Sequence, residues 1–491
     1  MKKVFLLIAL SFSIGVSSQS EQELVESTVS KDKIEGQIYF LAADELRGRK
    51  TGTAEIDIAA SYLANAFRSC GVEPVDKENG YYQHIPFEKT GTAKNQSIKI
   101  GKDLFEEFIF FDRENLNVKG EAIYLGFGLA EDYKNKNLRG KIIIIQSGSP
   151  DKNDWRTAYR MRKEKLSLAK ENGILGMIEL ISIDDDMWSR LDHNFSDVQM
   201  VVKKEKAQNE PLYFWLRTNE KTNSILESQN AHPAEVFVDG IKKEMVYSKN
   251  VVGIVKGTDA KLKNEFVIYS AHYDHNGVGK PNSSNDSIYN GARDNAVGTV
   301  TVLSAAENIA KYPTKRSALF ILFTGEEMGL LGSQYYAEHP LVPLNQSVFC
   351  FNSDNGGYND TSKATIIGLN RTSAAKHILS GAKTFGLNAI DDPAPEQGLF
   401  DRSDNVSFAA KGIPAPTYSM GFHSFDEEIN KYYHQVTDNP ETLDYDYLEK
   451  FFKSYVLTCR LIANDPETPF WIKGDKYYEA GVKLYEKELA N

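Results

Sequence analysis

The chain has 491 residues, of which 41% are hydrophobic and 25% are charged, and this composition is typical of soluble globular proteins with a large core. Its formal net charge is -11, and no lysine- or arginine-rich run stands out. This balance argues against nucleic acid or an anionic membrane surface as a main partner. The length exceeds that of one ordinary domain, so we expect more than one.

The first 18 residues have the layout of a secretory signal peptide. Two lysines precede an apolar run over residues 4–16, and two serines follow it. The run is too short to span a bilayer comfortably, although a membrane anchor is the alternative interpretation. No later segment has the unbroken apolar length of a transmembrane helix. We therefore expect an exported protein, periplasmic or extracellular, with no transmembrane segment once residues 1–18 are removed.

The three cysteines, Cys70, Cys350 and Cys459, are too few for a disulfide framework and lack the spacing of a zinc motif. We expect them to pack as small apolar side chains, although one pair could bridge in an oxidising compartment. Any metal is therefore expected to bind through oxygen and nitrogen.

The N-terminal region predicts two helices separated by a polar break. The first covers residues 34–41, and the break runs from 44 to 52. Apolar side chains at helical spacing predict the second helix over 56–67, with Thr53 as its N-terminal cap and Gly71 at its end.

Residues 95–246 differ from the flanking sequence in the pattern of their apolar and polar residues. Strand-like runs dominate, and no group of His, Asp and Glu has metal-ligand spacing. Because this segment separates two parts of one catalytic pattern, we interpret it as an inserted β-rich domain. The predicted organisation is a signal peptide at 1–18, a discontinuous catalytic domain at 19–94 and 247–491, and the insertion at 95–246.

From residue 250 onward, strands and helices alternate. The apolar runs 266–271, 318–323 and 348–351 predict strands, and 295–311 predicts a helix between the first two. This alternation indicates an α/β fold whose mixed, mostly parallel sheet is covered by helices. Ligands bind beyond the carboxyl ends of parallel strands in such sheets, so chemistry should follow each apolar run.

Histidines and acids do follow these runs, in the segments 270–275, 324–329 and 352–357. Imidazoles and carboxylates are the ligands that a hydrolytic two-metal site needs. The adjacent Glu326 and Glu327 suit a division in which one carboxylate binds metal and the other accepts a proton from water. Singly, each residue could be an ordinary surface or turn residue, but their joint placement favours a site.

These segments resemble the zinc aminopeptidase family that includes bacterial leucyl aminopeptidases, glutamate carboxypeptidases and glutaminyl cyclases. The similarity covers most of residues 36–80 and 250–460. It implies a zinc exopeptidase fold and two Zn²⁺ ions per chain that activate a water between them. One zinc would take His272 and Asp354, the other Glu327 and His434, and Asp294 would bridge them.

The resemblance also implies roles beside the metals. Glu326 would be the general base, and Asp274 would be the carboxylate that orients the site. We expect His275 to be a hydrogen-bond partner of a ligand rather than a ligand. The inserted segment resembles a protease-associated domain through residues 139–145.

The loop 400–404 matches a loop that borders the substrate pocket in the family. Arg402 would steady a carboxylate there, and Tyr418 or His423 would stabilise the oxyanion of the tetrahedral intermediate. The alternative is that this loop is purely structural.

We expect a peptidase acting on peptides or small proteins, first of all an aminopeptidase. A carboxypeptidase or dipeptidase would need a cation for a free carboxylate, and Arg293 and Arg402 keep that alternative open. The intact set of five ligands argues against a one-zinc glutaminyl cyclase. Retention of Glu326 argues against a non-catalytic peptide-binding protein, because binding alone needs no positioned base.

Overall fold

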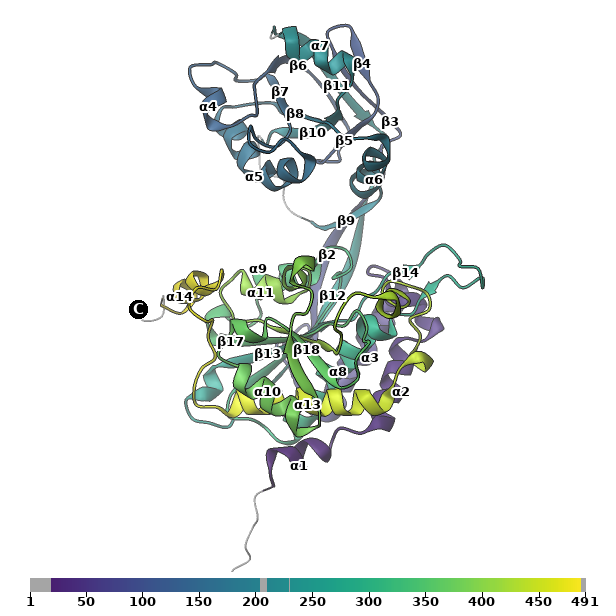
Figure 1. Ribbon diagram of the computed structural model, residues 1–491, viewed down its shortest axis with the longest axis vertical. Helices are drawn as coiled ribbons and strands as arrows, with labels where there is room; N and C mark the ends of the chain where they lie inside the picture. The colour runs from purple at the N-terminus through teal and green to yellow at the C-terminus, as the bar shows by residue number, and fades with distance from the viewer. Residues whose placement is uncertain (1–18, 204–209, 229, 487–491) are drawn as a thin grey trace, which may run out of the picture. The chain divides into compact units, whose positions relative to one another are not determined.

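The structure is a computed structural model that describes residues 19–203, 210–228 and 230–486 (Figure 1). The predicted signal peptide at 1–18 lies outside the described residues. The chain divides into two compact units, unit 1 with residues 1–85 and 248–491 and unit 2 with residues 86–247. Across the described part of the chain, no helix combines the length and the hydropathy of a membrane span.

Unit 1 is built on a mixed sheet with the strand order β19-β18-β20-β17-β13-β16-β12-β2. The central strands β13, β16, β17 and β20 are parallel to one another, whereas β12 and β18 join them antiparallel. The predicted α/β fold with a mostly parallel sheet is therefore confirmed. The strands are β2 (Tyr82–Thr90), β12 (Lys243–Val255), β13 (Phe266–His272), β16 (Ser317–Phe323), β17 (Ser347–Ser353), β18 (Lys363–Ile367), β19 (Asn388–Asp391) and β20 (Thr417–Met420).

Helices cover both faces of this sheet, which explains why its central strands are mostly apolar and are buried at almost every position. Successive side chains of a strand point to opposite faces, so Tyr269 of β13 enters one core and Ile268 the other. The first face carries α3 (Ala54–Cys70), α8 (Gly298–Lys311), α10 (Ala375–Thr384) and α13 (Tyr445–Asn464), and the second carries α9 (Leu331–Glu338), α11 (Asn405–Ala409) and α14 (Tyr478–Glu486).

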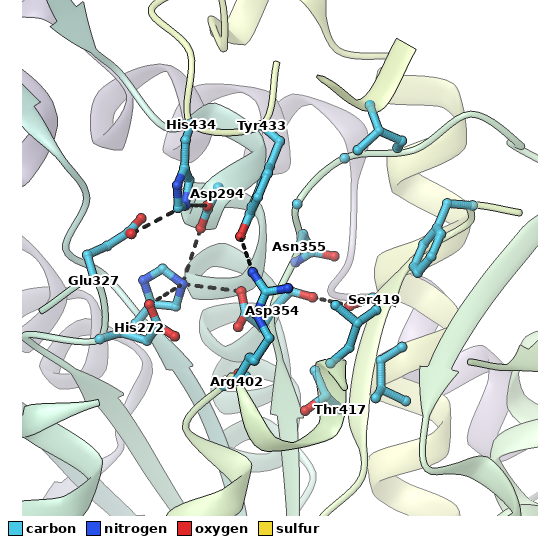
Figure 2. A pocket seen from close by; sticks show the side chains of 18 of the residues that line it. His272, Asp294, Glu327, Asp354, Asn355, Arg402, Thr417, Ser419, Tyr433 and His434 are labelled. Atoms are coloured by element: carbon cyan, nitrogen blue, oxygen red, sulfur yellow. Dashed lines mark hydrogen bonds and ion pairs between the residues drawn. The ribbon is translucent and has the colours of Figure 1, made fainter. Parts of the chain in front are cut away.

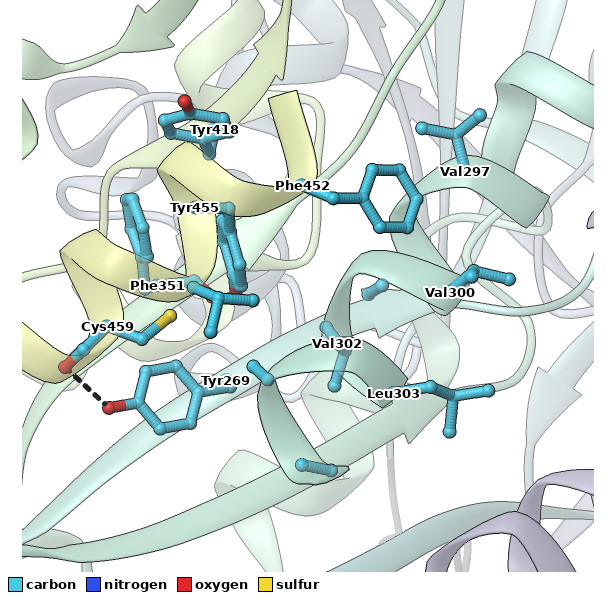
Figure 3. Packing of buried hydrophobic residues seen from close by; sticks show 14 of the residues in the cluster. Tyr269, Val297, Val300, Val302, Leu303, Phe351, Tyr418, Phe452, Tyr455 and Cys459 are labelled. Carbon is cyan, nitrogen blue, oxygen red and sulfur yellow. Dashed lines mark hydrogen bonds between the residues drawn. The ribbon is translucent and has the colours of Figure 1, made fainter. Parts of the chain in front are cut away.

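Figure 3 shows the first core, where α13 packs against the sheet and α8. The rings of Phe351 and Tyr455 are stacked with centroids 4.7 Å apart, and the Tyr269 hydroxyl donates to the carbonyl of Cys459 over 3.1 Å. Burial of such side chains stabilises the fold by about 1.5–3 kcal/mol each. The result is a rigid sheet whose carboxyl edge can hold side chains in fixed positions.

The N-terminal helices form close to where the sequence predicts them, as α2 (Lys31–Leu41) and α3. Gly71 ends α3 with φ 91, a left-handed conformation that favours glycine. Thr53 is the residue before α3, but its hydroxyl donates backwards to the carbonyl of Lys50 and caps no helix amide. The predicted N-cap position of Thr53 is therefore confirmed, but its side chain makes no capping hydrogen bond.

Unit 2 begins at residue 86, within β2, and ends at residue 247. The predicted limits of the inserted domain, 95 and 246, stay a prediction. The sheet of unit 2 has the order β4-β3-β11-β6-β7-β8-β10-β5. The resemblance to a protease-associated domain stays a prediction. The elements are β3 (Asn95–Ile100), β4 (Asp103–Phe105), β5 (Phe108–Phe110), β6 (Leu116–Tyr124), β7 (Ile142–Gln146), α5 (Trp155–Glu171), β8 (Gly176–Ile181), α6 (Asp185–Ser196), β9 (Gln199–Val202, paired with β2), β10 (Leu212–Arg217), α7 (Glu220–Ser228) and β11 (His232–Asp239).

The three cysteines are unbridged. Cys350 and Cys459 lie in the cores of unit 1, and Cys70 is partly buried at the end of α3. The expectation that they pack as small apolar side chains is confirmed.

Candidate metal centre

Three parallel strands deliver polar side chains to one edge of the sheet of unit 1. His272 is the last residue of β13, Asp354 follows β17 directly, and Glu326 and Glu327 come just after β16. Two further residues reach the same place from other segments (Figure 2): Asp294 from the turn before α8, and His434 from a loop near the C-terminus. The rule that ligands gather beyond the carboxyl ends of parallel strands holds here.

Asp294 lies between the two histidines. One carboxylate oxygen, Oδ1, is 3.3 Å from Nε2 of His272, and the other, Oδ2, is 3.1 Å from Nε2 of His434. The helix predicted over 295–311 begins only at 298, because Asp294 and the next residue leave helical geometry. This bend turns the carboxylate toward the histidines, as a bridging ligand requires.

Each histidine has a further acid beside it. Nε2 of His272 is 3.2 Å from Oδ1 of Asp354, and Nε2 of His434 is 3.3 Å from Oε2 of Glu327. Glu326 is also near, with Oε2 4.0 Å from Nε2 of His272. The structure thus brings together all five predicted ligands and the predicted base.

The side chains can be sorted into two groups whose ligand atoms all lie within 4.8 Å of one another. One group contains His272, Glu326 and Asp354, and the other contains His275, Asp294 and Glu327. Proximity alone does not separate a ligand from a base, because a base must also approach the reacting water. Both groups consist of nitrogen and oxygen donors, which fit zinc.

The charges of the cluster also fit cations. Burial opposes protonation of His272, but Glu326 and Asp354 outweigh it and raise the pKa of His272 well above its usual value. Burial likewise opposes protonation of His434, yet Asp294 and Glu327 raise its pKa to about 9. Four carboxylates thus surround two imidazoles, and metal ions would supply further positive charge.

Asp274 lies behind the cluster and is fully buried. Its carboxylate accepts a 3.1 Å hydrogen bond from the main-chain N–H of Glu326 and another of 3.1 Å from the Thr51 hydroxyl. Burial raises the pKa of Asp274 to about 6. Nδ1 of His272 is 3.1 Å from the main-chain carbonyl of Asp274 and 3.8 Å from its carboxylate. The Asp274 carboxylate therefore holds the segment of Glu326 by a direct hydrogen bond, whereas its contact with His272 is longer.

His275 is buried, and its Nδ1 is 2.6 Å from Oε1 of Glu327. This contact fits the predicted role as a hydrogen-bond partner of a ligand. His275 also belongs to the second group of candidate ligands, together with Asp294 and Glu327.

Arg293 does not face the site as a free cation. Its guanidinium donates a 3.0 Å hydrogen bond to Asp438 and lies over the ring of Tyr432, 3.6 Å from the centroid. The carboxylate of Asp438 also accepts the main-chain N–H groups of Arg293 and Asp294. Arg293 is thus neutralised within the fold, and it supports Asp294 rather than a substrate carboxylate.

A cavity of about 410 Å³ adjoins the cluster. Its walls near the metal ligands are polar, and its far walls are largely apolar, which is the usual character of a small-molecule site. The side chains beyond the metal cluster include Leu330, Ile367, Leu399, Arg402, Thr417, Ser419, Phe422, Phe425, Ile429 and Tyr433.

Of the three predicted pocket residues, only Arg402 lines this cavity. Tyr418 does not, because alternate residues of β20 point to opposite faces: Thr417 and Ser419 face the cavity, and Tyr418 enters the core, where its hydroxyl pairs with Ser454. The prediction for Tyr418 is therefore wrong.

The prediction that His423 borders the substrate pocket is also wrong. Its side chain is 55% exposed and lies 3.9 Å from Asp426, outside the cavity lining. Tyr433, which sequence reasoning missed, lines the cavity, stacks on His434 with centroids 4.1 Å apart, and accepts a 3.4 Å hydrogen bond from Arg402. Its position next to the proposed ligand His434 was the signal in the sequence that could have identified it.

Fold and site together define an α/β protein with a candidate metal centre at the carboxyl edge of its sheet. Residues 250–458 match the family model described as "Peptidase family M28".

Two relatives that the chain resembles carry the name aminopeptidase. Aminopeptidase YwaD of Bacillus subtilis is 30% identical over 207 residues, which cover 41% of this chain and 42% of the relative. The probable leucine aminopeptidase 2 of Aspergillus oryzae is 21% identical over 488 residues, covering 92% of this chain and 88% of the relative. The chain thus aligns with less than half of the first relative and with most of the second.

The fold is also found in a solved structure, the aminopeptidase from Aneurinibacillus sp. strain AM-1. The TM-score is 0.56 at 22% sequence identity, and the match covers 91% of this chain and 97% of that chain. At this identity the likeness shows the fold alone.

Proposed function

We propose that the protein is an exported aminopeptidase that hydrolyses the first peptide bond of peptides or small proteins. The observation that carries the proposal is the position of Asp294, which directs one oxygen to His272 and the other to His434, with Glu326 beside them. Export is supported by the signal-peptide pattern of residues 1–18. The aminopeptidases among the relatives support the choice of chain end.

Two zinc ions would be held by His272 with Asp354, by Glu327 with His434, and by Asp294 shared between them. When bound, they supply Lewis-acid activation of the attacking water and of the scissile carbonyl. The donor types and the surplus of negative charge in the cluster support this assignment.

Glu326 would accept the proton of the attacking water and pass it to the leaving amine. Its carboxylate reaches the cluster at 4.0 Å from His272, and its main-chain N–H is fixed by Asp274. Glu327, the neighbouring residue, is held by His275 and His434, so the two carboxylates have different surroundings.

Tyr433 takes over the role first given to Tyr418 and His423. Burial raises the pKa of its hydroxyl, which therefore stays protonated and can donate a hydrogen bond to the oxyanion. The apolar far walls of the cavity suit an apolar N-terminal side chain, and the acidic end suits the α-ammonium group.

A dipeptidase or carboxypeptidase remains the second candidate because of Arg402. Among the described residues that line the cavity, it is the only arginine or lysine. A guanidinium at this position could bind the free carboxylate of a short substrate through paired hydrogen bonds.

A matched set of peptides separates the two candidates. Leu-Gly-Phe would be compared with its N-acetylated and C-amidated forms, with release of leucine and of phenylalanine measured separately. We expect the amidated peptide to lose leucine at the rate of the free one and the acetylated peptide to be inert. Cleavage of the acetylated but not of the amidated peptide would overturn the aminopeptidase proposal.

A further inference from the structure

Arg49 is a buried cation close to the metal site, only 1% exposed. Its guanidinium donates to main-chain carbonyls: Nε to Tyr273 over 2.9 Å, Nη1 to Asn290 over 2.7 Å, and Nη2 to Gly291 over 3.0 Å. Nη1 also donates to the carbonyl of Leu41. One rigid planar group thus joins segments that are far apart in the sequence.

These segments are the ones that carry metal ligands. Tyr273 lies directly after His272, and Asn290 and Gly291 come shortly before Asp294. The relative position of His272 and Asp294 therefore depends on both segments keeping their distance from the Arg49 guanidinium. The fixed geometry of its five N–H groups is suited to holding several carbonyls at once, and a lysine ammonium cannot reproduce it.

A tight turn delivers Arg49 to this place. Arg47, Gly48 and Arg49 all have φ between 46 and 67, in the left-handed region. A Cβ on Gly48 would collide with the main-chain oxygens of Tyr289 and Gly277. Those residues belong to β14 (Gly277–Val278) and β15 (Ile288–Tyr289), the ribbon between the two ligand-bearing segments. Only glycine permits the turn to approach so closely.

Thr51 adds a second contact between this turn and the metal site. Its buried hydroxyl donates over 3.1 Å to Oδ2 of Asp274, whose other oxygen accepts the main-chain N–H of Glu326. Within four residues, the segment 48–51 thus contacts the supports of two ligands and of the proposed base.

Arg49 also supplies positive charge behind the acidic cluster. Burial lowers its pKa to about 10, against the attraction of Asp274, Asp438, Asp294 and Glu327, so the side chain remains charged at neutral pH. A buried charge without a direct carboxylate partner is costly, and that cost is offset here by the surrounding carbonyls and acids.

We propose that residues 48–51 form an outer clamp of the metal site, in which Arg49 is a positioning residue that fixes the spacing of His272 and Asp294, and Thr51 fixes Asp274. The clamp lies outside residues 250–458, the part that matches the family model. This inference rests on the proposed two-zinc site.

The test compares Arg49→Lys with Arg316→Lys in the full chain. Arg316 is equally buried and donates to the main-chain carbonyls of Ile462 and Asp465, but it precedes β16 and lies at the opposite end of that strand from Glu326. Both variants would be stripped of metal and titrated with Zn²⁺ against a chromogenic chelator, and their thermal unfolding would be recorded.

We expect Arg49→Lys to weaken zinc binding by about 10- to 100-fold, as loss of an outer support does at other metal sites. Arg316→Lys should lower the unfolding temperature and leave zinc affinity unchanged. Wild-type zinc affinity in Arg49→Lys, or an equal loss in Arg316→Lys, would overturn the proposal. The zinc content of the wild-type chain tests the site itself, so the two failures are distinguishable.

If Arg49→Lys does not fold, Thr51→Val carries the test, with Thr458→Val as its control. Thr458 is as buried as Thr51, but its hydroxyl bonds to the carbonyl of Ser454 within α13. Weaker zinc binding in Thr51→Val alone supports the clamp. Unchanged zinc binding in Thr51→Val, or the same loss in both, contradicts it.

Discussion

Both units bury ionisable side chains, but in opposite ways. In unit 2, Lys165 and Glu179 have fully buried side chains and form a 2.5 Å ion pair. Glu179 also accepts hydrogen bonds from the N–H of Gly148 and the hydroxyl of Tyr213. In unit 1, by contrast, carboxylates surround two histidines, and their charge is not neutralised within the cluster.

The difference separates a structural use of buried charge from a chemical one. A buried pair with complete hydrogen bonding needs nothing from outside the chain. A buried cluster with surplus negative charge requires a cation, and this requirement identifies a ligand site. Both units bury acids, so burial alone would not have distinguished the two.

Removal of metal should have the largest effect, and it should affect unit 1 alone. Stripping with a chelator should abolish hydrolysis and destabilise unit 1, because bound zinc stabilises a fold by about 4 kcal/mol at a concentration a thousandfold above its Kd. Hydrogen exchange should show faster opening in residues 266–272 and 317–323 and no change in 142–146. Full activity after stripping would remove the basis of the metal assignment.

The converse change is Lys165→Met in unit 2. Removal of one partner leaves Glu179 buried and unpaired, so unit 2 should lose about 3–5 kcal/mol of unfolding free energy. The double variant Lys165→Met, Glu179→Leu should regain most of that loss. Urea denaturation measures both, and zinc content should remain that of the wild type. Loss of zinc from either variant would contradict the separation of roles.

A smaller effect is expected from a pair of tyrosines within unit 1. Tyr433→Phe should lower kcat by about 10²–10³, because it removes the proposed oxyanion donor. Tyr418→Phe should leave kcat unchanged and cost about 1 kcal/mol of stability, because its hydroxyl bonds only within the core. Steady-state kinetics and thermal unfolding of both variants check this. The reverse pattern would restore the role first predicted for Tyr418.

The sequence predicts the features that depend on local pattern. The central strands of unit 1 are mostly apolar because both sheet faces are covered, and His272, Asp354 and the adjacent Glu326 and Glu327 stand where those strands end. Asp294 and His434 lie in other segments, and the family resemblance was needed to name them as ligands. The structure places all five proposed ligands and Glu326 in one cluster.

What the sequence could not predict depends on partners distant in the chain. The side of β20 that faces the cavity is set by its pairing with β17 and β18, and the residues around Tyr418 show no alternation. Arg293 looked available because Asp438, which neutralises it, lies 145 positions away. The break between 44 and 52 gave no sign that Arg49 would reach the metal site.

The most direct test of the central claim is the substitution Glu326→Gln, with zinc and kcat measured on the same sample. If the five ligands hold metal and Glu326 carries the proton, the variant should keep close to the wild-type zinc content and lose about 10²–10⁴ in kcat. A variant that keeps its kcat, or that loses zinc in proportion to activity, would contradict the assignment of Glu326 as the base.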